Sequence, residues 1–215
     1  MSHNWPELSA AEVNELLAAH YPAARCELNF STPFELLVAT VLSAQCTDER
    51  VNQVTPALFA RYPDALAMAA ATRKDLEEIL RPLGFQKSKA GYLLGIGEAL
   101  VARHGGEVPE SQEALESLPG VGRKTALVVR GNAFGHPGLA VDTHVTRVSK
   151  RLGIATGGTP LAIEKQLCAG LPAKEWTDFS HRVIVHGRRC CTARKPHCGR
   201  CVLNHKCESA VMDGE

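Results

Sequence analysis

The stretch LPGVGRKTA, residues 118–126, decides the fold, because it joins two helical patterns through a turn of only a few residues. Gly120 and Gly122 flank one apolar residue, Val121, which can turn inward and anchor the turn. Both glycines can adopt positive φ and leave backbone N–H groups uncovered. These groups lie beside the start of the next helix, where an anion is favoured. The stretch predicts a phosphate-binding helical hairpin; the alternative is a plain helical turn.

Lys124 falls in the first turn of the second helix of this hairpin. The positive end of a helix disfavours an ammonium group, and partial burial would disfavour it further. A lysine whose proton affinity is lowered in this way can act as an amine nucleophile. The alternative is a surface lysine that contacts phosphate.

Asp142 follows the apolar pair Ala140-Val141 and precedes Thr143-His144. This position is typical of a helix cap. A carboxylate that accepts backbone N–H bonds stays ionised, and an ionised carboxylate can stabilise positive charge on a sugar ring. Asp142 is therefore a candidate for both roles, which are compatible.

The rest of the chain has helical patterns and almost no strand signals. Cap residues and apolar spacing predict helices that begin near Ser9, Thr32, Thr72, Ser88, Glu113, Asp142, Thr159 and Lys174. The helix after Thr32 is apolar nearly all round, so we expect it to be the buried central one. Glycine-rich breaks at 135–138 and 153–158 are candidate boundaries. The sequence predicts an all-α fold.

The composition is that of an ordinary globular protein. The chain has 215 residues, of which 45% are hydrophobic and 22% charged, and this excludes disorder of the whole chain. No apolar run approaches the roughly 20 residues of a membrane span. Residues 1–10 lack the apolar core of an export signal. We expect a cytoplasmic protein.

The net charge is only +1, but the charges are unevenly distributed. The segment from 182 to 206 contains no acidic residue and seven basic ones, namely Arg182, Arg188, Arg189, Arg194, Lys195, Arg200 and Lys206. Such a local excess predicts a phosphate-binding surface. The alternative is a solvated basic face.

Five of the eight cysteines crowd the same C-terminal segment. Cys191, Cys198, Cys201 and Cys207 are separated by six, two and five residues. A four-cysteine zinc site usually has two close pairs, whereas a cubane iron–sulfur cluster tolerates wider spacing. Spacing favours iron–sulfur but leaves zinc or another metal open. Cys190 is one residue too early for this pattern and is left outside it. Arg194 and Lys195 lie in the six-residue loop between the first two of these cysteines. A bound metal could hold this loop so that both cations face a phosphate backbone; the alternative is that the metal only stabilises the C-terminal segment.

Together these features resemble the bacterial endonuclease III family, DNA glycosylase/lyases of the helix-hairpin-helix superfamily. The resemblance extends from 28–36 to Cys207, and its most specific strings are LSAQ at 42–45, LPGVGRKTA at 118–126, VDTH at 141–144 and the four-cysteine spacing. It implies an all-α protein of two domains. Residues 26–136 would form a six-helix domain with the helix-hairpin-helix at about 113–131. Residues 1–25 and 137–215 would form a discontinuous iron–sulfur cluster domain.

The resemblance also implies roles for single residues. Lys124 matches the nucleophile of the family and Asp142 its essential carboxylate. The four spaced cysteines match the ligands of one 4Fe-4S cluster. Gln45 matches the residue that fills the gap left by an extruded base, and Phe85 stands where the family often has a leucine wedge. Further DNA contacts are expected at Gly120, Val121, Gly122, Arg123, Thr143, His144, Arg194 and Lys195.

The implied function is base excision repair of damaged double-stranded DNA. Oxidised pyrimidines would be removed through a Schiff base on Lys124, followed by β-elimination, by a monomer associated with the nucleoid and not with a membrane. One alternative is a mismatch adenine glycosylase, a family that typically lacks a lysine at position 124. Another is a metal-stapled module that only binds DNA, which would leave Lys124 and Asp142 without a role.

Overall fold

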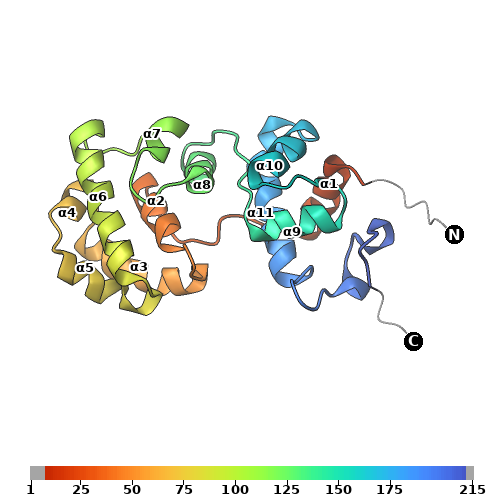
Figure 1. Ribbon diagram of the computed structural model, residues 1–215, viewed down its shortest axis with the longest axis horizontal. Helices are drawn as coiled ribbons and strands as arrows, with labels where there is room; N and C mark the ends of the chain where they lie inside the picture. Colours follow the sequence, from red (N-terminus) through yellow and green to blue (C-terminus); the bar gives the residue numbers. More distant parts are fainter. Residues whose placement is uncertain (1–7, 212–215) are drawn as a thin grey trace. The chain divides into compact units, whose positions relative to one another are not determined.

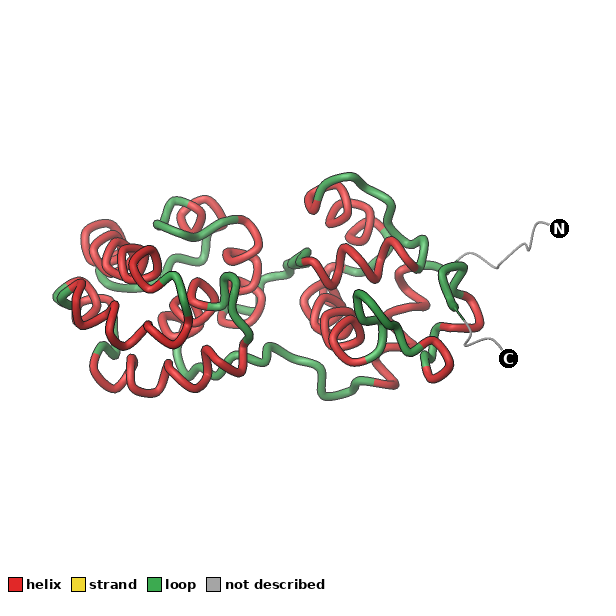
Figure 2. Tube along the Cα trace, turned by 60° about the horizontal axis from the view of Figure 1, so that its bottom comes forward, coloured by secondary structure: helices red, strands yellow, loops and turns green. Residues whose placement is uncertain are grey.

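The structure is a computed structural model that describes residues 8–211 (Figure 1). These residues form helices joined by loops and contain no strand (Figure 2), which confirms the all-α prediction. None of the helices within 8–211 has both the length and the apolar composition needed to cross a bilayer. The chain divides into two compact units. One unit spans Glu27–His136, and the other joins the residues up to Cys26 with those from Pro137 onward.

The continuous unit surrounds one central helix. Its helices are α2 (Pro33–Leu42), α3 (Asp48–Arg61), α4 (Ala65–Ala69), α5 (Arg73–Leu80), α6 (Gln86–His104), α7 (Gln112–Glu116) and α8 (Arg123–Ala133). Thr32 caps α2 by accepting a hydrogen bond from the backbone N–H of Glu35. Eight of the ten residues of α2 are buried, which confirms it as the central helix. It packs against α8 and α3, while α6 packs against α4 and α5.

Two helices of this unit were not predicted from the sequence. Helix α3 contains Pro56 in its interior, where proline removes a backbone hydrogen bond, and its polar residues interrupt the apolar spacing. Helix α4 has only five residues, too few to show a period. Tertiary packing stabilises both, since Val51, Leu58 and Met68 are buried. Among the predicted helices, α6 begins at Gln86, two residues earlier than expected.

The discontinuous unit contains α1 (Ala10–His20), α9 (Thr143–Arg151), α10 (Pro160–Ala169) and α11 (Trp176–Arg189). Ser9 and Glu12 form the predicted capping box at the start of α1. Apolar residues from all four helices form one core, which includes Val13, Leu17, Val145, Val148, Ile163, Leu167, Phe179 and Val183. Leu203 is also fully buried in this core, so the cysteine-rich C-terminal segment is anchored to it.

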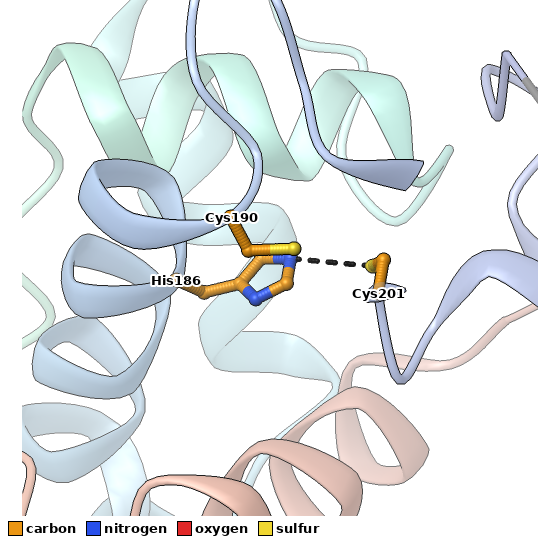
Figure 3. A group of neighbouring side chains, drawn as sticks. All are labelled: His186, Cys190 and Cys201. Atoms are coloured by element: carbon orange, nitrogen blue, oxygen red, sulfur yellow. Dashed lines mark hydrogen bonds between the residues drawn. The ribbon is translucent and has the colours of Figure 1, made fainter. Parts of the chain in front are cut away.

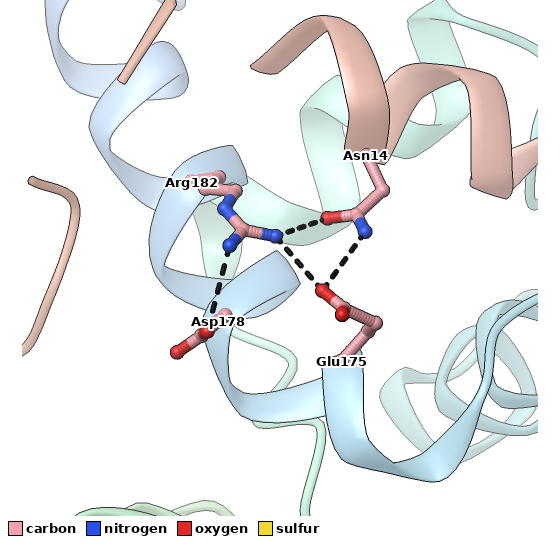
Figure 4. A network of polar contacts seen from close by, with 4 residues as sticks. All are labelled: Asn14, Glu175, Asp178 and Arg182. Atoms are coloured by element: carbon pink, nitrogen blue, oxygen red, sulfur yellow. Dashed lines mark hydrogen bonds and ion pairs between the residues drawn. The ribbon is translucent and has the colours of Figure 1, made fainter. Parts of the chain in front are cut away.

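A polar network ties α1 to α11 (Figure 4). The guanidinium of Arg182 donates hydrogen bonds to Asn14 Oδ1 at 2.6 Å and to Glu175 Oε2 at 3.2 Å, and it contacts Asp178 Oδ2 at 3.4 Å. Asn14 Nδ2 also donates to Glu175 at 3.2 Å. Arg182 therefore stabilises the fold, and we no longer assign it to the predicted phosphate-binding surface.

Lys206 is removed from that surface for a similar reason. Its Nζ lies 2.7 Å from Glu12 Oε1, so it forms an ion pair with α1. By contrast, Arg194 and Lys195 are exposed in the loop between Cys191 and Cys198. The basic segment is thus divided between cations that hold the fold and cations that face solvent.

Candidate functional site

The glycine hairpin connects α7 to α8. Ser111 caps α7 by accepting a hydrogen bond from the N–H of Ala114. The N–H of Val121 donates to the carbonyl of Leu118 at 3.1 Å and closes the turn. The Val121 side chain is buried, as expected from its place between two glycines. The turn is therefore fixed from inside, and its outer surface is backbone.

Glycine is favoured at the two hairpin positions for different structural reasons. Gly120 has φ +74°, and a Cβ there would lie 2.7 Å from Cγ of the Tyr92 ring. Gly122 has φ −99°, so the expected positive φ is wrong at this position. It is the N-cap of α8, which requires an extended backbone, and no side chain within 8–211 caps the helix there. A Cβ at Gly122 would meet nothing within 4 Å, so the first-turn N–H groups of α8 are open to an anion.

Lys124 and Arg123 lie in the first turn of α8 and are both exposed. Within this unit the buried residues of α8 are 126–129, which follow both cations along the helix. An exposed amine at this position can be reached by a substrate as large as DNA.

Asp142 is the N-cap of α9 and is half-buried. Its Oδ1 accepts a hydrogen bond of 2.8 Å from the N–H of Val145, which confirms the capping role. The carboxylate is held in one orientation by this bond. Lys124 and Asp142 belong to different units of the chain.

The residues after Asp142 present one exposed and one half-buried polar group. Thr143 is exposed, whereas His144 is half-buried and its Nδ1 lies 3.1 Å from Arg147 Nη2. Burial lowers the pKa of His144, and Arg147 and Arg188 add to this shift, while Asp142 and a hydrogen bond with the backbone of Gly187 oppose it. The net shift favours the neutral imidazole.

Gln45 and Phe85 share an unusual backbone conformation. Their φ values are +56° and +50°, and within 8–211 they are the only non-glycine residues with positive φ. Such a conformation costs about 1 kcal/mol or more per residue and marks functional loops. Both residues are exposed, and they line one pocket together with Cys46, Thr47, Arg50, Arg81, Pro82, Leu83 and Gly84. The structure thus brings the two predicted wedge residues together.

Lys89 supports this pocket and was missed by sequence reasoning. It is only 3% exposed, and its Nζ donates to the carbonyl of Leu83 at 3.2 Å. Burial lowers the pKa of Lys89, against a smaller opposing effect of Cys46. The sequence spacing could have indicated its burial, because Lys89 lies four and seven residues before Leu93 and Ile96, on the same buried face of α6.

The four spaced cysteines line one pocket in the C-terminal segment, together with Cys190 and His186. Cys190, which the spacing had excluded, is buried and its Sγ lies 3.5 Å from the carbonyl of His197. None of the eight cysteines, all of which lie within 8–211, forms a disulfide. Sequence spacing alone missed Cys190 and His186 because it does not show which side chains face one another across a folded loop.

The donor set of this pocket fits an iron–sulfur cluster. Burial raises the pKa of the Cys201 thiol to about 12 and also raises the pKa of Cys207. Such thiols ionise when a metal offsets the cost of burying charge. Arg151 Nη1 donates to Cys191 Sγ at 3.3 Å, and Arg151 also donates to the carbonyls of Thr192 and Ala193. Four sulfur donors with a cation beside them are typical of a cubane cluster.

Comparison with known proteins identifies the family. Residues 38–173 match the model of the HhH-GPD superfamily base excision DNA repair proteins, and residues 191–207 match the iron–sulfur binding domain of endonuclease III. Endonuclease III of Synechocystis sp. is 51% identical over 202 residues, which cover 94% of this chain and 92% of that protein. Endonuclease III of Escherichia coli is 43% identical over 197 residues, which cover 92% and 93%.

Solved structures agree with this result. A non-covalent endonuclease III–DNA complex superposes with a TM-score of 0.90 at 43% identity and covers 94% of this chain and 97% of that one. A trapped endonuclease III–DNA covalent intermediate gives the same values. The family resemblance and the 4Fe-4S cofactor expected from the sequence are thereby confirmed. This chain belongs to the endonuclease III family of HhH-GPD base excision DNA repair proteins.

Proposed function

We propose that Lys124 and Asp142 are the catalytic residues of this chain, a base-excision DNA glycosylase and abasic-site lyase that removes oxidised pyrimidines from duplex DNA. The observation that carries the proposal is the place of Lys124, exposed in the first turn of the helix that follows the glycine hairpin. An amine there is close to backbone N–H groups that bind phosphate. As a DNA-repair monomer, the enzyme would act on the nucleoid.

Binding and base extrusion use groups that need no sequence readout. The open N–H groups of α8, with Gly120, Val121, Gly122 and Arg123, would hold the phosphates of the damaged strand. Gln45 and Phe85 would enter the duplex as the lesion leaves the stack, since damage makes extrusion cheaper. On α9, Thr143 and His144 would contact phosphate oxygens. Arg194 and Lys195 would add a second, salt-sensitive contact.

The chemistry follows from an amine and a carboxylate. Lys124 Nζ attacks the anomeric carbon of the deoxyribose, the bond to the base breaks, and the base leaves with the bonding electron pair. The ionised Asp142 stabilises the positive charge that develops on the sugar. The sugar ring then opens as the C1′–O4′ bond breaks and O4′ takes up a proton, and this leaves a Schiff base between C1′ and Lys124 Nζ. The Schiff base acidifies the C2′ proton. Loss of that proton expels the 3′ phosphate by β-elimination, and hydrolysis of the imine frees Lys124.

The thiolates of Cys191, Cys198, Cys201 and Cys207 would hold the 4Fe-4S cluster, which would supply a cross-link within the C-terminal segment. The chain's own contribution is to present Arg194 and Lys195 on the loop between the first two ligands. Arg151 donates to the sulfur and carbonyls at the start of this loop and so fixes its path.

Borohydride trapping tests the nucleophile. Reduction during turnover of an abasic-site duplex should cross-link the protein to DNA, and Lys124→Gln should abolish the cross-link. Lys74→Gln, at an exposed lysine of the same unit, is the matched control and should cross-link like the wild type. A full yield of cross-link in the Lys124 variant would reject the assignment.

Asp142→Asn separates charge from capping. Asparagine is as good an N-cap as aspartate, so the fold of α9 should persist. Base release should fall by about 100-fold or more because the charge is lost, while DNA affinity stays near the wild-type value. An active Asp142→Asn enzyme would leave the carboxylate with the capping role alone.

A further inference from the structure

Three donor atoms converge at one end of the cysteine pocket (Figure 3). His186 Nε2, Cys190 Sγ and Cys201 Sγ all lie within 4.8 Å of one another. His186 comes from the last turn of α11, Cys190 follows that helix, and Cys201 follows the turn at Cys198–Arg200. His186 and Cys190 are only 1% and 6% exposed. Neither belongs to the set of four cysteines proposed to hold the cluster.

The separation of two of these atoms is that of a tetrahedral zinc site. His186 Nε2 and Cys201 Sγ are 3.6 Å apart. Ordinary zinc–nitrogen and zinc–sulfur bond lengths at a tetrahedral angle place the two ligand atoms about 3.5 Å apart. One zinc ion can therefore bridge this pair with little movement of either side chain.

The imidazole is also oriented as a ligand. Its other nitrogen, Nδ1, lies 3.2 Å from the hydroxyl of Tyr21 at the end of α1. Histidines that bind zinc usually hydrogen-bond through their second nitrogen, which fixes the ring and the tautomer. With the proton on Nδ1 and donated to Tyr21, the lone pair of His186 Nε2 faces the two thiols.

We propose that His186, Cys190 and Cys201 bind one zinc ion, with water in the fourth position, and that this zinc and the iron–sulfur cluster exclude one another. Two thiolates and an imidazole are the borderline-soft donors that zinc prefers. Binding releases the two thiol protons to solvent and involves no redox change. The exclusion rests on the proposed cluster ligands, since Cys201 belongs to both sets. Metal supply during folding then decides which form of the protein is made.

Metal analysis of the full-length chain tests this. Protein is produced with iron in excess, or with iron limiting and zinc supplied, and iron and zinc are measured by mass spectrometry alongside the visible absorption of the cluster. The wild type should carry the cluster in the first case and one zinc per chain in the second. Cys190→Ala should keep the cluster and bind zinc more than about 100-fold more weakly. Cys198→Ala should lose the cluster and keep the zinc.

The iron content of Cys190→Ala doubles as its folding control. Cys168→Ala, at a cysteine outside the pocket, is the control for non-specific thiol binding and should carry the same metal as the wild type under each of the two growth conditions. Wild-type zinc affinity in Cys190→Ala would overturn the zinc site. Loss of iron from that variant would also overturn it, because Cys190 would then be a cluster ligand. Full iron in Cys198→Ala would instead reject the proposed cluster ligands.

Discussion

At the scale of single residues, the hairpin shows why two neighbouring glycines are not equivalent. Gly120 is required twice, by its positive φ and by the Tyr92 ring against its Cα. Gly122 meets neither condition, because its φ is −99° and a Cβ there would meet nothing within 4 Å. The fold therefore requires glycine at 120, whereas at 122 we propose that glycine lets a DNA phosphate approach the backbone.

This difference predicts opposite effects of the same substitution. Gly120→Ala should lower the free energy of unfolding by about 2 kcal/mol, since the backbone is strained and the methyl group meets Tyr92. Gly122→Ala should cost less than about 1 kcal/mol, yet it should weaken binding to abasic-site DNA about tenfold by keeping the phosphate from the backbone. Urea unfolding and fluorescence anisotropy measure the two effects. Equal destabilisation by both substitutions would contradict this reading.

His144 predicts a dependence of stability on pH. Its pKa in the folded protein lies below the ordinary value of 6.5, so above pH 6.5 both states are neutral and burial carries no penalty. As the pH falls below 6.5 the unfolded chain binds the proton first, and the folded state loses stability. His144→Gln should therefore lose less stability than the wild type between about pH 7 and pH 5.

Urea unfolding midpoints at the two pH values measure this difference. The comparison is made between the wild type and His144→Gln in the same buffers. Identical pH dependence in His144→Gln would show that the titration of this buried imidazole does not affect stability.

At the scale of elements, the ends of α2 and α6 form the loops that hold Gln45 and Phe85. Each loop contains one left-handed residue, and the buried Lys89 fixes the loop of Phe85 through the carbonyl of Leu83. The fold tolerates this strain because α2 and α6 are anchored by packed apolar faces. Two rigid helices thus present an exposed amide and an exposed ring in one pocket.

Phe85→Ala tests the wedge. The ring is 67% exposed, so its removal should change the free energy of unfolding by less than about 0.5 kcal/mol. Base release from duplex DNA should slow about tenfold or more, because no aromatic ring then inserts into the duplex to help unstack the damaged base. Cleavage of a single-stranded abasic site, which needs no unstacking, should be unchanged. Leu66 is also 67% exposed, and Leu66→Ala is the control that should leave duplex activity intact.

At the scale of the whole molecule, the net charge of +1 does not show that the basic residues of the C-terminal segment have different environments. Arg182 forms an ion pair with Glu175 at the start of its own helix, and Lys206 forms one with Glu12 of α1, whereas Arg194 and Lys195 face solvent in the loop between Cys191 and Cys198. Salt dependence of DNA binding should therefore come from Arg194 and Lys195. The double change Arg194→Gln and Lys195→Gln should reduce the slope of log affinity against log salt concentration by about 2.

Arg182→Gln provides the contrast. It should lower the free energy of unfolding by about 1–3 kcal/mol, since Asn14 and Glu175 lose a partly buried partner. The salt slope of DNA binding should stay at the wild-type value. A reduced slope in this variant would return Arg182 to the phosphate-binding surface.

The sequence by itself determined the helical class, most helix starts and the hairpin, because caps, glycines and apolar periodicity act over a few neighbouring residues. Asp142 capping α9, the capping box at Ser9 and the buried α2 all follow from such local signals. The family also follows from strings and spacings along the chain, and the assignment of the four spaced cysteines as cluster ligands is a prediction from its resemblance.

Only the tertiary structure decided which side chains meet across long separations. It stabilised α3 around Pro56, buried Lys89, moved Arg182 into the fold and placed Cys190 and His186 beside Cys201. These outcomes depend on burial and on contacts between segments distant in sequence, where the cost of desolvation selects the partners. Local propensity carries no information about such contacts, so no reading of neighbouring residues reveals them.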